Sequence, residues 1–137
     1  MEQHFQLTDV EFNEQFTNCS LNPELFSHEA HLRLGWINIK NLGLKKGEEN
    51  IQKQLQNFVI HVGAHDKYNK TVTIVAMKIL NHFMQQSKTD NFKDFINENS
   101  KLKDNFKQLI ANHYSNDIFK SEKAKTVFLE PDLIPFD

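Results

Sequence analysis

Residues 22–43 read NPELFSHEAHLRLGWINIKNLG and predict the helix around which the fold is built. Asn22 followed by Pro23 is a helix start signal, because a cap residue before a proline at the first helical position is typical of helix N-termini. Apolar positions then recur with helical spacing at Leu25, His28, Leu32, Gly35, Ile39 and Leu42, and Ala30, Leu34 and Ile37 widen the stripe. A helix that is apolar over so much of its circumference should be central and should end near Gly43.

Two further helices are predicted before residue 70. Thr8 and Glu11 have the spacing of a capping box, which predicts a short helix through about Thr17. From Glu48, apolar residues repeat with helical spacing, and Gly63 is a natural terminator of that helix.

The run Thr71-Val72-Thr73-Ile74-Val75 is β-branched and by itself suits a strand. The longer helical periodicity from Val72 to Phe83 favours a helix instead, with Asn69 as its N-cap.

The last third of the chain predicts short helices and an irregular end. Phe92 to Ile96 and Leu102 to Ile110 carry helical spacing, and Ser121 can cap one last turn. Residues 130–135 contain two prolines, which lack a donor and restrict the residue before them, so an extended strap is expected there. The sequence therefore predicts an all-α fold, a single domain over residues 1–137 with about five or six helices and a proline-containing C-terminal strap.

Composition excludes several classes of protein. Sixteen Lys and Arg against eighteen Asp and Glu give a net charge of −2, and neither sign forms a long block, so a nucleic-acid partner is not expected. The apolar runs are far shorter than the roughly 20 residues of a membrane span. The single cysteine, Cys19, excludes an internal disulfide, and the N-terminus lacks the pattern of a secretory signal, so a cytoplasmic protein is expected.

The candidate chemistry lies in the central helix. His28 and His31 project from one face and offer two imidazoles to a divalent first-row transition metal. Glu29 lies nearby, and His61, His65 or Asp66 is available from another element. The signal is weak, because His-x-x-His lacks the full-turn spacing of zinc-protease helices.

A small anionic ligand is the alternative. The only arginine, Arg33, can pair a carboxylate or phosphate in bidentate fashion, while Trp36 and Tyr68 form walls. Such a pocket would lie between the helix of residues 22–43 and the helix that follows Asn69. Its predicted residues are His28, His31, Arg33, Trp36, Lys67, Tyr68, Asn69 and Thr71.

The same residues also allow purely structural roles. His28 can be a core histidine satisfied by Thr71 or Thr73, Arg33 can pair with Glu29 one turn away, and Glu130 or Asp132 can clamp the tail to Arg33. His4 is expected in a mobile terminus. On this interpretation the chain is a non-enzymatic interaction module that forms a homodimer or binds a protein partner. A metal-dependent enzyme is the third hypothesis.

Three motifs resemble an uncharacterised family of small bacterial helical proteins. They are residues 26–36, residues 67–73, and the ending Tyr114-Ser115 with residues 128–133. The family pattern is a His-x-x-His-Leu-Arg helix, then Lys-Tyr-His-x-Thr-x-Thr, then a tail with Glu-Pro-Asp-Leu. The resemblance implies a helical fold but no known activity. Asn69 stands where the family pattern has histidine, and its amide can donate and accept hydrogen bonds but cannot titrate near neutrality.

Overall fold

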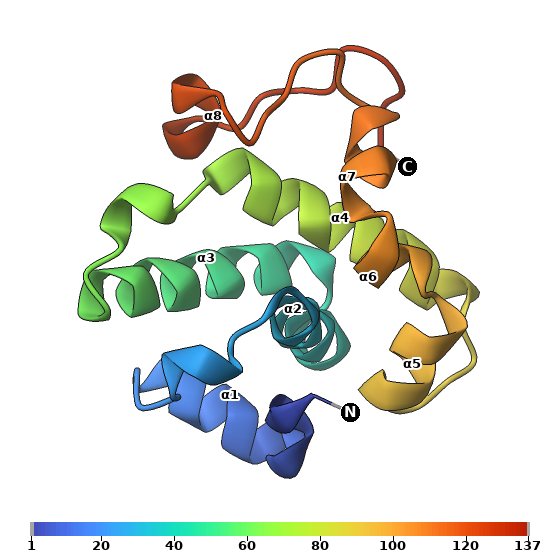
Figure 1. The fold of residues 1–137 in the computed structure, drawn as a ribbon. Helices are drawn as coiled ribbons and strands as arrows, with labels where there is room; N and C mark the ends of the chain where they lie inside the picture. Colours follow the sequence, from blue (N-terminus) through green and yellow to red (C-terminus); the bar gives the residue numbers. More distant parts are fainter. Residues whose placement is uncertain (1, 137) are drawn as a thin grey trace. The chain divides into compact units, whose positions relative to one another are not determined.

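The computed structural model describes residues 2–136 and confirms the all-α class. Over these residues the chain forms eight α-helices and three 3-10 helices, with no strand, so the helices are more numerous than predicted (Figure 1). The chain divides into two compact units, residues 1–68 and 69–137, and each is described by itself. The single domain expected over residues 1–137 stays a prediction. Within the described chain, no helix combines the length and apolarity needed to cross a membrane.

The first unit is built from three α-helices and three short 3-10 turns. In chain order these are η1 (Gln3–Gln6), α1 (Asp9–Thr17), η2 (Pro23–Leu25), α2 (His28–Leu42), α3 (Leu44–His61) and η3 (His65–Lys67). The capping box predicted for α1 is present, because Thr8 accepts from the Glu11 amide while the Glu11 side chain accepts from the Thr8 amide. In Figure 1, α2 is seen nearly along its axis while α3 runs across the view.

The central helix begins later than predicted. Asn22 caps only the turn η2, and α2 starts at His28 with Ser27 as its N-cap, which accepts from the Ala30 amide. Every residue from 29 to 39 except His31 is buried, so α2 is central as expected. His28 is exposed, however, because it is the first helical residue; its prediction as a core histidine was wrong.

A single glycine separates α2 from α3. Gly43 has φ of +83°, a conformation that residues with a side chain rarely adopt, and α3 starts directly after it at Leu44 rather than at Glu48. The two long helices are thereby forced to change direction within one residue. At the other end of α3, Gly63 has φ of +74° and lies just beyond the C-terminus, as predicted.

A buried amide network joins the three helices of the first unit. Asn38 of α2 donates to Gln54 Oε1 of α3 at 2.9 Å, and Gln54 donates onward to Asn13 and Thr17 of α1, both at 2.9 Å. Asn38 and Gln54 expose 2% and 4% of their surface. Unpaired buried amides are costly, so this network favours one relative placement of α1, α2 and α3.

The second unit begins with the longest helix after α3. Asn69 caps α4 (Lys70–Gln86) by accepting from the Val72 amide, so the β-branched run is helical as predicted. Four short helices follow: α5 (Phe92–Glu98), α6 (Lys101–Asp104), α7 (Phe106–Ala111) and α8 (Glu122–Thr126). Ser121 caps α8 as expected. Buried phenylalanines of α5 and α7, among them Phe95 and Phe106, contribute to the core.

The C-terminal strap is confirmed. Residues 127–136 contain no helix or strand and run back past the end of α7 (Figure 1). Tyr114 donates its hydroxyl hydrogen to the Leu129 carbonyl at 2.6 Å, and Asp132 accepts from the Ser115 amide and hydroxyl. Burial raises the pKa of Tyr114 to about 12, with Glu130 and Asp132 adding to the shift, so the phenol keeps its proton. The predicted contact of Asp132 with Arg33 stays a prediction, because the two residues belong to separately described units.

The amide network yields a stability prediction. Replacing Gln54 by Leu leaves the Asn38 amide and two polar side chains of α1 without their partner, so the free energy of unfolding should fall by about 1–3 kcal/mol. The matched control is Gln56→Leu, an exposed position on the same helix, which should change stability by no more than about 0.5 kcal/mol. Urea denaturation measures both variants, and equal stabilities would contradict the role of the network.

Candidate functional site

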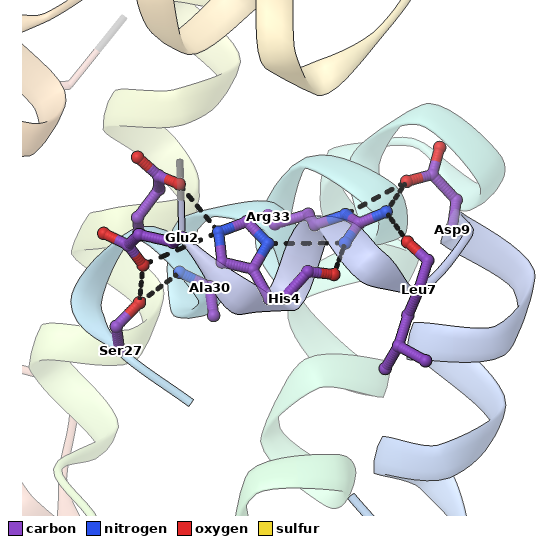
Figure 2. Close-up of polar contacts among 8 residues, drawn as sticks. Glu2, His4, Leu7, Asp9, Ser27, Ala30 and Arg33 are labelled. Carbon is purple, nitrogen blue, oxygen red and sulfur yellow. Dashed lines mark hydrogen bonds and ion pairs between the residues drawn. The ribbon is translucent and has the colours of Figure 1, made fainter. Parts of the chain in front are cut away.

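Arg33 holds the N-terminal segment against α2. Its Nε and Nη2 donate to Asp9 Oδ1 at 3.1 and 2.9 Å, Nη1 donates to the His4 carbonyl at 2.7 Å, and Nη2 also donates to the Leu7 carbonyl at 2.8 Å (Figure 2). The guanidinium carbon lies 4.9 Å from the centre of the Phe12 ring, and only 4% of the residue is exposed. The predicted pairing of Arg33 with Glu29 was therefore wrong. Arg33 thus clamps the N-terminal segment of its own unit.

His4 is the second member of this cluster, and it is completely buried rather than mobile. Its Nε2 lies 2.7 Å from Glu29 Oε1, and its Nδ1 lies 3.3 Å from Arg33 Nη1. A guanidinium can only donate, so Nδ1 accepts and Nε2 carries the proton that is donated to Glu29. Burial lowers the pKa of His4, although the hydrogen bond with Glu29 opposes that shift, so His4 is neutral at pH 7.

Glu2 completes a group with the composition of a metal site. Its Oε1 lies 3.7 Å from His4 Nε2 and accepts from the Ser27 hydroxyl. Potential ligand atoms of Glu2, His4 and Glu29 lie within 4.8 Å of one another, the only such group of three among residues 2–136. A histidine that binds metal usually donates its other N–H to a carbonyl or carboxylate. The second nitrogen of His4 faces a cationic donor instead, so the geometry favours a hydrogen-bonded network over a metal centre.

The two histidines predicted to bind metal have different environments. His28 is exposed, whereas His31 is partly buried with its ring centre 5.2 Å from that of Phe26. Burial, with a smaller contribution from His28, lowers the pKa of His31 to about 4, so its imidazole is neutral at pH 7. The described part of the chain brings no third histidine, cysteine or carboxylate into a metal-binding group with them. Their metal role stays a prediction.

The other predicted ligand residues of the first unit are spread along it. Trp36 exposes 3% of its surface and has the Lys40 ammonium 4.6 Å from its ring centre. Lys67 is exposed in η3, and the Tyr68 hydroxyl lies 3.5 Å from Gln52 Oε1. None of these contacts gathers the residues around one point.

Asn69 and Thr71 lie in the second unit, where hydrogen bonds engage both side chains. Asn69 Nδ2 donates to the Ile118 carbonyl, and Thr71 Oγ1 donates to the Val127 carbonyl, both at 2.9 Å. Thr71 Oγ1 also accepts from the Leu129 amide at 3.1 Å. Both side chains therefore fasten the C-terminal part of the unit to α4. A pocket between α2 and α4 stays a prediction, because the two helices belong to separately described units.

A cavity that sequence reasoning missed lies within the second unit. Its volume is about 380 Å³, and it is bounded by α4, by the end of α7 and by the strap. Its apolar lining consists of Ile79, Phe83, Leu109, Ile134, Pro135 and Phe136, and its polar lining of Lys78, His82, Asn112 and His113. Lys78 and His82 are four residues apart on α4, which was a readable signal. The strap residues come from more than fifty positions later in the chain, and no spacing rule connects them to α4.

The cavity has a distinct electrostatic character. Three of the described lining residues carry basic nitrogens, and no residue of the described lining is acidic. Such a lining favours an anion over a cation, because the described lining residues offer no carboxylate to pair with a positive ligand. The described residues thus offer an apolar chamber with basic groups in its wall.

No family model, curated protein or solved structure matches the chain. The resemblance to small bacterial helical proteins stays a prediction carried by its three motifs.

The Arg33 clamp can be tested by a charge-conserving substitution. Arg33→Lys keeps the positive charge, but an ammonium group cannot replace the planar guanidinium that contacts Asp9 and two carbonyls together. We expect a loss of about 1.5–3 kcal/mol in the free energy of unfolding and faster amide exchange in residues 3–7. Lys45→Arg, the reverse exchange at an exposed position of α3, serves as the control and should be nearly neutral. Unchanged stability and exchange in Arg33→Lys would show that the clamp is dispensable.

The buried histidines predict a loss of stability in acid. The pKa values of His4 and His31 are lower in the folded protein than the ordinary value of 6.5, so below pH 6.5 the unfolded chain binds more protons. Their contribution is complete above about pH 6.5 and is lost as the pH falls toward 4. For His31 we expect about 1–3 kcal/mol, less than the full shift implies because the side chain is only partly buried. Urea denaturation at pH 7.5 and 4.5 measures the loss, and His31→Gln should reduce it. An identical loss in His31→Gln and the native chain would exclude this histidine as its source.

Proposed function

We propose that this chain binds a small organic anion with an apolar body, and that the cavity of the second unit is the binding site. One observation carries the proposal: a single chamber combines apolar walls with basic side chains, and its described lining has no acidic residue. Binding sites for small molecules are commonly concave, mostly apolar and equipped with a few polar groups that orient the ligand. The proposal keeps the predicted class of ligand and moves the site away from α2.

The volume limits the size of the ligand. About 380 Å³ lies within the range of roughly 300–1,000 Å³ found for small-molecule sites. At about 30 Å³ for each water-sized group, the cavity holds on the order of a dozen such groups. A straight-chain carboxylate of medium length, such as octanoate, fits this size. Its chain would cover the side chains of Ile79, Phe83 and Leu109, and each buried methylene is worth about 0.8 kcal/mol.

The charged groups define the head of the ligand. Lys78 and His82 lie on one face of α4, and His113 belongs to the opposite wall after α7. The Lys78 ammonium and the His82 imidazole can donate to a carboxylate, and His113 can do so through Nε2 when its ring carries both hydrogens. A hydrogen bond with a charged partner is stronger than a neutral one. A polar anion without an apolar body would leave six apolar side chains in contact with water. An amphipathic carboxylate therefore matches the chamber better than inorganic phosphate.

The N-terminal cluster supports this choice by contrast. Four hydrogen bonds donated by Arg33 end on protein oxygens, and His4 lies between Glu29 and Arg33. An anion entering there would have to break these buried contacts and would meet Glu2 and Glu29.

Calorimetric titration of the full chain tests the proposal. We expect octanoate to bind saturably and octylammonium not to bind, because only the anion matches the basic lining. Lys78→Met should weaken octanoate binding about tenfold, a typical effect of losing one hydrogen bond to a charged group.

A volume control separates the cavity from the surface. Leu109→Trp adds an indole to the cavity wall and should abolish binding, whereas Gln108→Trp adds the same group at an exposed neighbour and should leave it intact. Absence of octanoate binding, or equal binding by both tryptophan variants, would refute the proposed site.

A further inference from the structure

The strap is attached in two steps. Its first part is firmly anchored, because Leu129 accepts from the buried Tyr114 hydroxyl and Asp132 accepts from Ser115 through both amide and hydroxyl. Ser115 also holds the pKa of Asp132 below its usual value through these bonds, so this carboxylate stays charged at pH 7. The chain up to Asp132 is thus fixed to the segment that follows α7.

Beyond Asp132 the described contacts of the strap centre on His113, with a further ring contact between Phe136 and Tyr114. Among the described residues, two hydrogen bonds join this end to His113: the Leu133 amide donates to the His113 backbone carbonyl at 3.0 Å, and His113 Nδ1 lies 2.6 Å from the Ile134 carbonyl. The Phe136 ring stacks on the same imidazole with 4.2 Å between ring centres. Leu133 and Ile134 leave more than half of their surface exposed, so burial contributes little to holding this end.

The contact with Ile134 fixes the state of the imidazole. A carbonyl oxygen can only accept, so Nδ1 of His113 carries a hydrogen, and Nε2 is the nitrogen left to act on the cavity that His113 lines. A carboxylate that accepts a hydrogen bond from Nε2 favours the doubly protonated ring. The bond from Nδ1 to the Ile134 carbonyl then becomes charge-assisted and stronger. Lys78 and His82 are the other titratable groups of the described lining, and both favour the presence of an anion.

We infer that His113 couples ligand binding to closure of the strap. A carboxylate bound in the cavity strengthens the attachment of residues 133–136, and release of those residues lowers the affinity of the cavity for the carboxylate. Thermodynamic coupling is reciprocal, so if the ligand stabilises the attached strap, the attached strap must strengthen ligand binding by the same factor. The inference rests on the proposed function and adds its regulation. His113 acts here as a positioning residue for the strap and as one of the groups that recognise the ligand head.

Amide exchange of Leu133 in the full chain, with and without saturating octanoate, tests the coupling directly. This N–H donates to the His113 backbone carbonyl, next to the Ile134 carbonyl that the imidazole contacts, so its exchange reports local opening of the strap end. We expect octanoate to slow it at least about threefold. His113→Phe keeps a ring that can stack on Phe136 but lacks the donor, so octanoate should bind about fivefold more weakly, the effect of one lost hydrogen bond. In this variant octanoate should no longer slow Leu133 exchange.

Two further variants keep the test decisive. His113→Asn offers an uncharged donor, so it should retain folding while losing the ligand-dependent slowing. His82→Gln removes the other cavity histidine and should weaken octanoate binding. Saturating octanoate should still slow the amide exchange of Leu133 in this variant. Octanoate binding without any change at Leu133 in the native chain would overturn the coupling and leave the proposed function standing. Absence of octanoate binding would overturn both.

Discussion

The first unit depends on the saturation of one guanidinium. Arg33 is the only arginine of the chain, and it cannot release its proton when buried. Its burial therefore requires acceptors on several sides, and the N-terminal segment supplies them through Asp9 and the carbonyls of His4 and Leu7. This requirement brings residues 3–9 onto α2 and carries His4 to Glu29. A cluster that resembles a site in composition is thus explained by the needs of a single buried cation.

The two units use their polar residues in opposite ways. In the first unit, polar side chains bind other parts of the protein. The amides of Asn38 and Gln54 join α2 to α3, and the charged groups of Arg33 and Glu29 attach the N-terminal segment to α2. In the second unit, Thr71 and Asn69 perform that task near the start of α4, while basic groups further along α4 line a cavity. The same residue types thus serve packing at one place and line a chamber at another, and only their surroundings distinguish the two roles.

Local signals in the sequence predicted local structure well. The caps at Thr8, Asn69 and Ser121 were readable because a cap depends on residues only three positions apart. The start of α2 was placed too early because the cap signal at Asn22 and Pro23 begins a separate 3-10 turn and not the long helix. The partners of Arg33 were missed because Glu29 is the obvious neighbour in a helix, while Asp9 lies 24 residues away and is brought close only by the fold. The cavity was missed for the same reason, since its walls come from distant segments.

The location of a bound carboxylate tests the account most directly. Intermolecular nuclear Overhauser effects between the methylene protons of octanoate and the full chain would identify the side chains that surround it. The account predicts contacts with Phe83, Leu109 and Ile134, which belong to the three segments that enclose the cavity. Contacts with residues around Arg33, or an octanoate that shows no contact with these cavity side chains, would contradict it.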